Sequence, residues 1–311
     1  MTSDHDGARE HLQAHATMAE ATLAHQDGAF DWAAHLARLE RGEELFEPLF
    51  EQAAGWLREL RDSAPVGRIL DVGSGAGVVS AVLARAFPDA QVMAVDGTPA
   101  LLDAVGVRAE RLGISKQVHV LHASLPEDAA SLPEADLIWA SDALHHLGDQ
   151  QAAIDLLHRR LSPGGLLAVC EGGLPARYLP NELGFGRPGL QARLDAASAD
   201  RFAAMRAALP GAVAAIDDWP GMLRASGLQG VSSRSFLRDI PSPLPDKARA
   251  FVIGEFAAFH DWLNEQLDTT DVSSLARLLD QDDAQGLMRR PDVFVLAART
   301  VHTARRRERT A

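Results

Sequence analysis

Residues 68–77, Arg-Ile-Leu-Asp-Val-Gly-Ser-Gly-Ala-Gly, decide the fold of this chain. A short apolar strand runs directly into three glycines that are separated by single residues, Gly73, Gly75 and Gly77. Glycine permits backbone angles that side chains forbid, and it leaves room for a bound nucleoside against the main chain. Residues 76–87 follow with apolar side chains at helical spacing, so the turn leads into a helix N-terminus with free backbone N–H donors.

The spacing of this loop argues against a dinucleotide ligand. The dinucleotide fingerprint needs a glycine or alanine at the sixth position counted from Gly73, where the chain has Val78. Asp71 stands two residues before the first glycine, where its charge would repel a pyrophosphate and attract an ammonium group. A nicotinamide oxidoreductase is therefore disfavoured, and a ligand with a cationic amino-acid moiety is favoured.

The composition excludes several classes of protein. The chain has 311 residues, of which 47% are hydrophobic, so it is long enough to bury a sizeable core. A net charge of −13 argues against nucleic acid as a partner, and no apolar run reaches the roughly 18 residues of a membrane helix. Residues 1–20 contain no apolar signal-peptide region. We therefore expect a cytoplasmic protein with no membrane partner.

Cysteine and histidine usage indicates neither a disulfide nor a metal centre. The single cysteine, Cys170, lies inside an apolar run, which predicts a buried and inert thiol. Five of the twelve histidines fall in the first 35 residues at irregular spacing, without cysteine ligands. We expect these histidines to be surface residues of a helical leader, and we expect no metal.

Beyond Pro65 the sequence alternates between strand and helix patterns. Short connections between these patterns predict right-handed β-α-β units and a parallel sheet. Residues 166–170 are continuously apolar, which is typical of a strand covered on both faces. We predict strands at 68–72, 91–95, 117–121, 135–140, 165–170, 229–238 and 292–300. We predict helices at 8–62, 76–87, 99–112, 126–131, 149–161 and 217–227, with a loop at 174–190 and helical segments at 189–216 and 245–287.

The glycine segment resembles motif I of the class I S-adenosylmethionine (SAM) methyltransferases of the small-molecule type. The resemblance covers residues 66–171 by ordered motifs and residues 217–300 by pattern. It implies an α/β fold with a doubly wound, seven-stranded, mostly parallel sheet that ends in an antiparallel C-terminal hairpin. A helical N-terminal segment, residues 1–62, would precede the SAM-binding domain, residues 63–311. Helical insertions at about 174–216 and 245–287 would form a lid.

The resemblance also implies a set of cofactor-binding positions. The glycine loop would face the methionine end of SAM. Asp96 ends the second strand 19 residues after Gly77, and its carboxylate would accept both ribose hydroxyls, since Thr98 already provides a helix cap. Ser124 would bind the adenine amine through its hydroxyl. The complete expected set is Asp71, Gly73, Ser74, Gly75, Gly77, Asp96, Gly97, Ala123, Ser124, Ser141 and Asp142.

Three residues that follow the fourth and fifth strands are candidate catalytic groups. A hydroxyl acceptor loses its proton as the methyl group moves, and an imidazole with a pKa near 6.5 accepts that proton at neutral pH. The segment resembles the pattern of hydroxy-aromatic O-methyltransferases, in which His145 falls on the general base and Glu171 on the flanking acid. His146 replaces an aspartate of that pattern, and it falls on the recurrent histidine of ubiquinone-type O-methyltransferases.

We therefore predict a SAM-dependent methyltransferase that acts on a small organic molecule. The first candidate for the methylated atom is an oxygen of a hydroxylated natural product or quinone-like compound. We expect a role in secondary metabolism. A small-molecule N- or C-methyltransferase and a SAM-binding protein that catalyses a cyclisation are the alternatives. An activated sulfonium donor needs little more than alignment with its acceptor, so a base is not obligatory. Arg177 and Arg187 are candidates for binding an acidic acceptor group. The expected assembly is a homodimer formed through the helical segments.

Overall fold

The computed structural model describes residues 32–62, 64–214 and 216–308. The chain divides into two compact units, each considered separately below. The glycine-loop unit comprises Gly42–Leu174, Arg206–Arg238 and Ala298–Ala311, and the insertion unit comprises Met1–Arg41, Pro175–Met205 and Asp239–Ala297. Residues 8–31 of the helix predicted over 8–62 lie outside the described residues, as do four of the five N-terminal histidines. Within the described ranges no helix combines the length and the apolar character that a membrane crossing requires.

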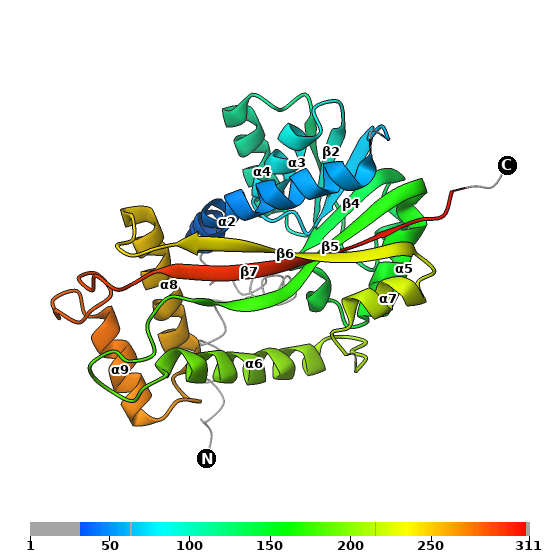
Figure 1. Ribbon diagram of the computed structural model, residues 1–311. Coiled ribbons are helices and arrows are strands. Elements are labelled where there is room, and N and C mark those ends of the chain that lie inside the picture. Colours follow the sequence, from blue (N-terminus) through cyan, green and yellow to red (C-terminus); the bar gives the residue numbers. More distant parts are fainter. Residues whose placement is uncertain (1–31, 63, 215, 309–311) are drawn as a thin grey trace, which may run out of the picture. The chain divides into compact units, whose positions relative to one another are not determined.

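A seven-stranded sheet in the order β3-β2-β1-β4-β5-β7-β6 organises the fold (Figure 1). The central strand β1 pairs in parallel with β2 and β4, and Leu70 lies opposite Met93 on one side and Ile138 on the other. β3 and β5 extend these parallel pairs outward, and the C-terminal strands are antiparallel. The predicted fold class is therefore confirmed. The strands are β1 (Arg68–Val72), β2 (Gln91–Asp96), β3 (Val118–His122), β4 (Ala135–Ser141), β5 (Leu161–Arg177), β6 (Gln229–Ile240) and β7 (Val295–Arg305).

The helices agree closely with the periodicity of the sequence. The predicted helix over 99–112 is α4 in full, because Pro99 fixes its start and Gly113, with φ 70°, ends it. The helix predicted over 76–87 begins later, at Val78, because Gly77 takes a left-handed conformation as its N-cap. The α-helices are α2 (Trp32–Arg61), α3 (Val78–Ala86), α4 (Pro99–Leu112), α5 (Gln150–Arg160), α6 (Leu190–Ala208), α7 (Trp219–Ala225), α8 (Asp246–Leu263) and α9 (Thr269–Leu279), with 3-10 turns η1 (Ala129–Ser131) and η2 (Leu144–His146).

The apolar face of α2 packs against the sheet of the glycine-loop unit. Leu49, Ala53 and Leu57 are fully buried, as their helical spacing predicts. Phe50 meets Trp139 of β4 edge-on, with ring centroids 6.3 Å apart. This packing joins the part of α2 that carries these residues to the sheet of the glycine-loop unit.

β5 is longer than the predicted strand over 165–170, so the expected loop over 174–190 begins only after Arg177. A Cβ on Gly173 would lie 2.2 Å from the carbonyl oxygen of Ala298 in β7. Glycine at this position allows the backbone of β7 to approach closely, and the strand continues past Glu171. The predicted turn Ser162–Gly165 likewise lies within β5, with Gly164 at φ 74°.

Asp271 in α9 joins two arginines of the insertion unit. Its carboxylate is buried, and it accepts hydrogen bonds from Arg187 Nη2 at 2.8 Å and from Arg193 Nε at 2.6 Å. Arg177 pairs separately with Asp195. Arg187 and Arg177 are therefore engaged in ion pairs within this unit, which speaks against their expected role in binding an acidic acceptor.

Substitution of Asp271 by alanine is expected to destabilise the protein by about 3 kcal/mol, because Arg193 would lose its carboxylate partner and Arg187 would keep only Asp268. Hydrogen bonds from Arg193 hold the pKa of Asp271 below its usual value, so this stabilisation is present above the unfolded pKa and is lost as the pH falls through the folded pKa. Urea unfolding at pH 7 measures the loss. The exposed Asp261 in α8, changed to alanine, is the control, and equal midpoints for both variants would contradict the prediction.

Candidate functional site

The glycine loop between β1 and α3 has the backbone that its sequence predicts. Gly73, Gly75 and Gly77 have φ angles of 69°, 53° and 78°, all in the left-handed region that favours glycine. The backbone N–H groups of Gly73 and Ser74 donate to the carbonyl oxygen of Val95 at 2.9 and 3.1 Å. These two hydrogen bonds hold the loop against the end of β2.

Each of the three glycines also faces a different part of the protein at close range. A Cβ on Gly73 would lie 2.5 Å from Ala143 Cβ, and one on Gly77 would lie 2.9 Å from Val105 Cγ2. A Cβ on Gly75 would lie 2.5 Å from Glu43 Oε1, at the side chain of a residue in α2. The space beside the loop is thus shared with protein side chains, whereas the sequence predicted only room for a ligand.

Asp71 is a buried structural partner of the loop. Ser80 in α3 donates its hydroxyl to Asp71 Oδ2 at 2.5 Å, which ties the strand before the loop to the helix after it. Burial raises the pKa of Asp71 to about 7, and the neighbouring charge of Asp96 raises it as well. The loop therefore carries an unusual concentration of acidic groups.

Asp96 connects the end of β2 to the glycine loop. Its Oδ2 accepts a hydrogen bond from the backbone N–H of Gly75 at 3.2 Å, and its Oδ1 accepts one from the N–H of Thr98 at 2.9 Å. Thr98 is the N-cap residue of α4, but its side chain makes no capping hydrogen bond. The expectation that Thr98 caps the helix by itself is therefore wrong, and Asp96 supplies the side-chain acceptor at this turn. Burial raises the pKa of Asp96.

The expected adenine-binding residues lie where β3 ends. Ala123 is buried, and its N–H donates to the carbonyl oxygen of Asp96 at 3.1 Å. The N–H of Ser124 donates to Asp128 Oδ2 at 2.9 Å, so an acidic side chain is present beside Ser124 although the sequence pattern placed none there. The carbonyl oxygen of Gly97 is hydrogen-bonded to the His122 ring at 3.0 Å.

His145 and Glu171 form a hydrogen-bonded dyad. His145 Nδ1 lies 2.6 Å from Glu171 Oε2, while Glu171 Oε1 accepts the N–H groups of Ala143 and Leu144 at 3.0 and 2.9 Å. Arg206 donates to the carbonyl oxygen of His145 at 2.5 Å. Three donors, Ala143 N–H, Leu144 N–H and His145 Nδ1, fix the carboxylate of Glu171, and this carboxylate orients the imidazole from within β5.

The two adjacent histidines have opposite electrostatic settings. Burial lowers the pKa of His145, but the hydrogen bond and charge of Glu171 outweigh this effect, so its pKa is raised above 6.5. Burial and the charge of His145 lower the pKa of His146 to about 4. His146 Nδ1 is buried and has no hydrogen-bond partner among the described residues. His146 is therefore neutral at pH 7, and His145 is the histidine of the pair whose protonated form Glu171 stabilises.

Ser141 and Asp142 continue β4 toward this dyad. Asp142 has a φ of 47°, and its Oδ1 accepts a hydrogen bond from Arg299 of β7 at 3.2 Å. Ligand atoms of Asp142, His145 and Glu171 lie within 4.8 Å of one another, which is close enough for a cation. Arg299 and the backbone already neutralise or engage these carboxylates, so we assign no metal to them.

Cys170 is a buried residue beside the candidate site. It is fully buried within β5, opposite Ser141 of β4. Burial raises the pKa of its thiol to about 12, which agrees with the expected inert cysteine.

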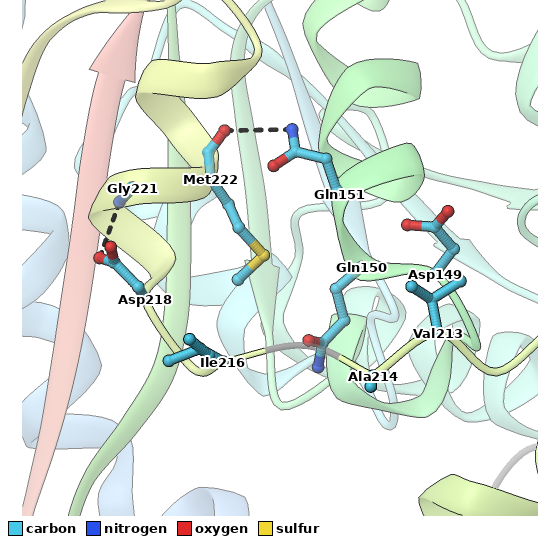
Figure 2. Close-up of a pocket in the computed structure, with 9 residues that line it drawn as sticks. All are labelled: Asp149, Gln150, Gln151, Val213, Ala214, Ile216, Asp218, Gly221 and Met222. Carbon is cyan, nitrogen blue, oxygen red and sulfur yellow. Dashed lines mark hydrogen bonds between the residues drawn. The ribbon is translucent and has the colours of Figure 1, made fainter.

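An open pocket of about 400 Å³ lies beside α5 and α7 (Figure 2). Both amide atoms of Gln150 are buried there without a hydrogen-bond partner in the described part of the chain, while the amide of Gln151 donates to the carbonyl oxygen of Met222 at 3.2 Å. The pocket contains none of the predicted site residues. Its lining residues are Asp149, Gln150, Gln151, Val213, Ala214, Ile216, Asp218, Gly221 and Met222.

Sequence reasoning missed Glu43, Arg206 and Arg299, which reach the predicted site from distant segments. Arg206 and Arg299 have no local signal, because they follow 61 and 157 residues after the groups they contact. Glu43 does have one, since it stands three residues before the buried Phe46 on the apolar stripe of α2. A charged residue in register with a buried face indicates a specific partner.

A family model described as a methyltransferase domain matches residues 69–165. This range begins in β1 and ends in β5, so it contains the glycine loop, Asp96 and the two histidines. The matched segment is the part of the chain in which the sequence motifs are ordered and specific.

Methyltransferases are among the curated relatives of this chain. The malonyl-[acyl-carrier protein] O-methyltransferase of Dechloromonas aromatica is 33% identical over 150 residues, which cover 46% of this chain and 53% of that protein. The trans-aconitate 2-methyltransferase of Methylobacterium nodulans is 28% identical over 262 residues, which cover 80% of this chain and 92% of that protein. The chain covers 24%, 44% and 36% of the first three curated relatives, which is less than half of each.

Among solved structures, the chain is similar to a SAM-dependent methyltransferase from Thiobacillus denitrificans in complex with S-adenosyl-L-homocysteine. The two share 17% sequence identity with a TM-score of 0.44, over 82% of this chain and 90% of that one.

Proposed function

We propose that this chain, whose residues 69–165 match a methyltransferase domain, is a class I SAM-dependent methyltransferase that transfers a methyl group from SAM to an oxygen atom of a small hydroxylated compound. The matched domain supports the expected family, enzyme class and cofactor, and the acceptor and the methylated atom belong to the proposal as well. A hydroxylated natural product or quinone-like compound is the acceptor class, as the sequence predicts. A cytoplasmic location and a homodimer remain predictions.

The glycine loop offers polar atoms that fit SAM. Ser74 Oγ is buried beside the loop and has no hydrogen-bond partner among the residues described, and Glu43 Oε2 is in the same situation. Such atoms are costly unless a ligand or water satisfies them. We assign the methionine end of SAM to the loop, the ribose to Asp96 and the adenine to Ala123 and Ser124. SAM supplies an electrophilic methyl group on a positively charged sulfur.

The observation that carries the choice of oxygen is the His145–Glu171 dyad. Glu171 binds the Nδ1 side of the imidazole, so Nε2 is the nitrogen that takes the proton of an acceptor hydroxyl as the O–methyl bond forms. The negative charge of Glu171 stabilises the resulting imidazolium. An amine or a carboxylate acceptor has less need of this arrangement, because it reacts without losing a proton to a base in the same step.

Purified protein, radiolabelled SAM and three acceptor panels test this function. Phenols and hydroxyquinones are expected to become labelled, with S-adenosylhomocysteine formed in equal amount. Labelling of amines alone, or of carboxylic acids alone, would replace the proposal with N-methylation or ester formation. Binding of SAM without S-adenosylhomocysteine formation on any panel would favour the non-methylating alternative.

A further inference from the structure

Glu43 reaches from α2 to the start of α3, where the glycine loop ends. Its Oε1 is the atom that a Cβ on Gly75 would meet at 2.5 Å. The backbone N–H groups of Ala76 and Val78 favour the charged form of this carboxyl group and so lower its pKa. Oε1 therefore lies against the loop that the sequence assigns to SAM.

The other side of this carboxylate has no partner. Glu43 Oε2 is buried, and no donor within the described ranges reaches it. Arg108, whose charge acts on Glu43, donates to the carbonyl oxygen of Ala76 at 3.0 Å and to Glu44 at 3.2 Å. A buried carboxylate oxygen without a donor costs free energy, so this position calls for a hydrogen-bonding cation.

The surroundings of Glu43 are acidic. Burial, followed by the charge of Asp71, raises the pKa of Glu43 to about 8. The charge of Arg108 lowers this pKa and has the smallest effect. Asp96, which accepts from Gly75 on the same loop, is also buried. Three carboxyl groups thus lie at one short loop, and a positively charged ligand would favour the ionised form of Glu43.

We propose that Glu43 binds the ammonium group of the methionine end of SAM, so that α2 supplies a cofactor-binding residue outside the matched domain. This inference rests on the proposed function, because it takes SAM as the ligand of the loop. The ammonium group fits better than the sulfonium, since only the ammonium has N–H donors for Oε2. S-adenosylhomocysteine keeps the ammonium group, whereas 5′-methylthioadenosine lacks the whole amino-acid moiety.

Titration calorimetry with these two ligands tests the proposal without measuring activity. Glu43→Gln is expected to weaken S-adenosylhomocysteine binding by about 10- to 100-fold, the range of a hydrogen bond between charged groups. Binding of 5′-methylthioadenosine should stay within about 2-fold of wild type, because that ligand makes no use of Glu43. Glu51→Gln, at an exposed position of α2, is the matched control and should leave both affinities unchanged.

Thermal unfolding of the same variants guards against a folding defect. A carboxyl group whose pKa is raised by folding makes the protein less stable as the pH rises from the unfolded-state pKa toward the folded-state pKa. Glu43→Gln should therefore melt at or above the wild-type temperature at pH 8. An unchanged affinity for S-adenosylhomocysteine, or an equal loss for both ligands, would overturn the proposal. If wild type binds neither ligand, the proposed function itself fails.

Discussion

His145→Ala is expected to lower kcat for a hydroxyl acceptor by about 10²- to 10⁴-fold, the usual contribution of a positioned general base. The affinity for SAM should change little, because His145 belongs to the turn after β4 and the cofactor is assigned to the glycine loop. Steady-state kinetics with a phenolic acceptor, together with calorimetric binding of S-adenosylhomocysteine, separate the two effects. His119→Ala, at an exposed position of β3, is the control and should retain wild-type kcat.

The pH profile distinguishes a base from a residue that only shapes the turn. Glu171 raises the pKa of His145, so wild-type kcat should increase through a pKa above 6.5 as the imidazole loses its proton. Glu171→Gln removes the charge, and the increase in kcat should then move to lower pH and level off at a lower value. A variant of His145 that keeps full activity, or a profile that Glu171→Gln does not move, would rule out the base.

The structure distinguishes the adjacent histidines His145 and His146 more sharply than the sequence does. The sequence makes both histidines candidate bases and places His145 first, and their rings lie only 4.0 Å apart. Glu171 reaches His145 alone, and the charge of His145 then lowers the pKa of its neighbour to about 4. The carboxylate that distinguishes them follows 26 residues after His145, and the sequence placed it beside the histidines only through the resemblance to hydroxy-aromatic O-methyltransferases.

Local chemistry explains which parts of the fold could be predicted. β1 has the predicted bounds because a short, mostly apolar run defines it. α4 has the predicted bounds because a proline defines its start and a glycine its end. The glycine loop has the predicted positive φ angles because no other residue adopts them at low cost. These elements are encoded within windows of about 15 residues, the range in which periodicity is informative.

Contacts between distant segments explain what was missed. β5 continues to Arg177 because β7 covers its edge, and the fit of Gly173 against Ala298 joins residues far apart in the sequence. Glu43 lies 32 residues before Gly75, on a helix that has no motif of its own. The residues expected to bind SAM thus lie mostly in local sequence motifs, whereas tertiary packing brings in the distant residues that contact them.

Asp96→Ala is expected to weaken S-adenosylhomocysteine binding by about 100-fold or more, because a diol loses two hydrogen bonds to a charged acceptor. The substitution has a second effect, since the N–H groups of Gly75 and Thr98 lose their carboxylate and the loop is left without that restraint. Asp103→Ala, at an exposed position of α4, is the control.

A 2′,3′-dideoxy analogue of S-adenosylhomocysteine separates the two effects of Asp96. If the carboxylate binds the ribose, the analogue binds the wild-type protein weakly. Asp96→Ala then lowers the affinity for the analogue far less than it lowers the affinity for S-adenosylhomocysteine, as a double-mutant cycle requires. If Asp96 only shapes the loop, the substitution weakens both ligands by the same factor. That second outcome would leave the ribose without an assigned acceptor, and it would show that the carboxylate at the end of β2 serves the glycine loop alone.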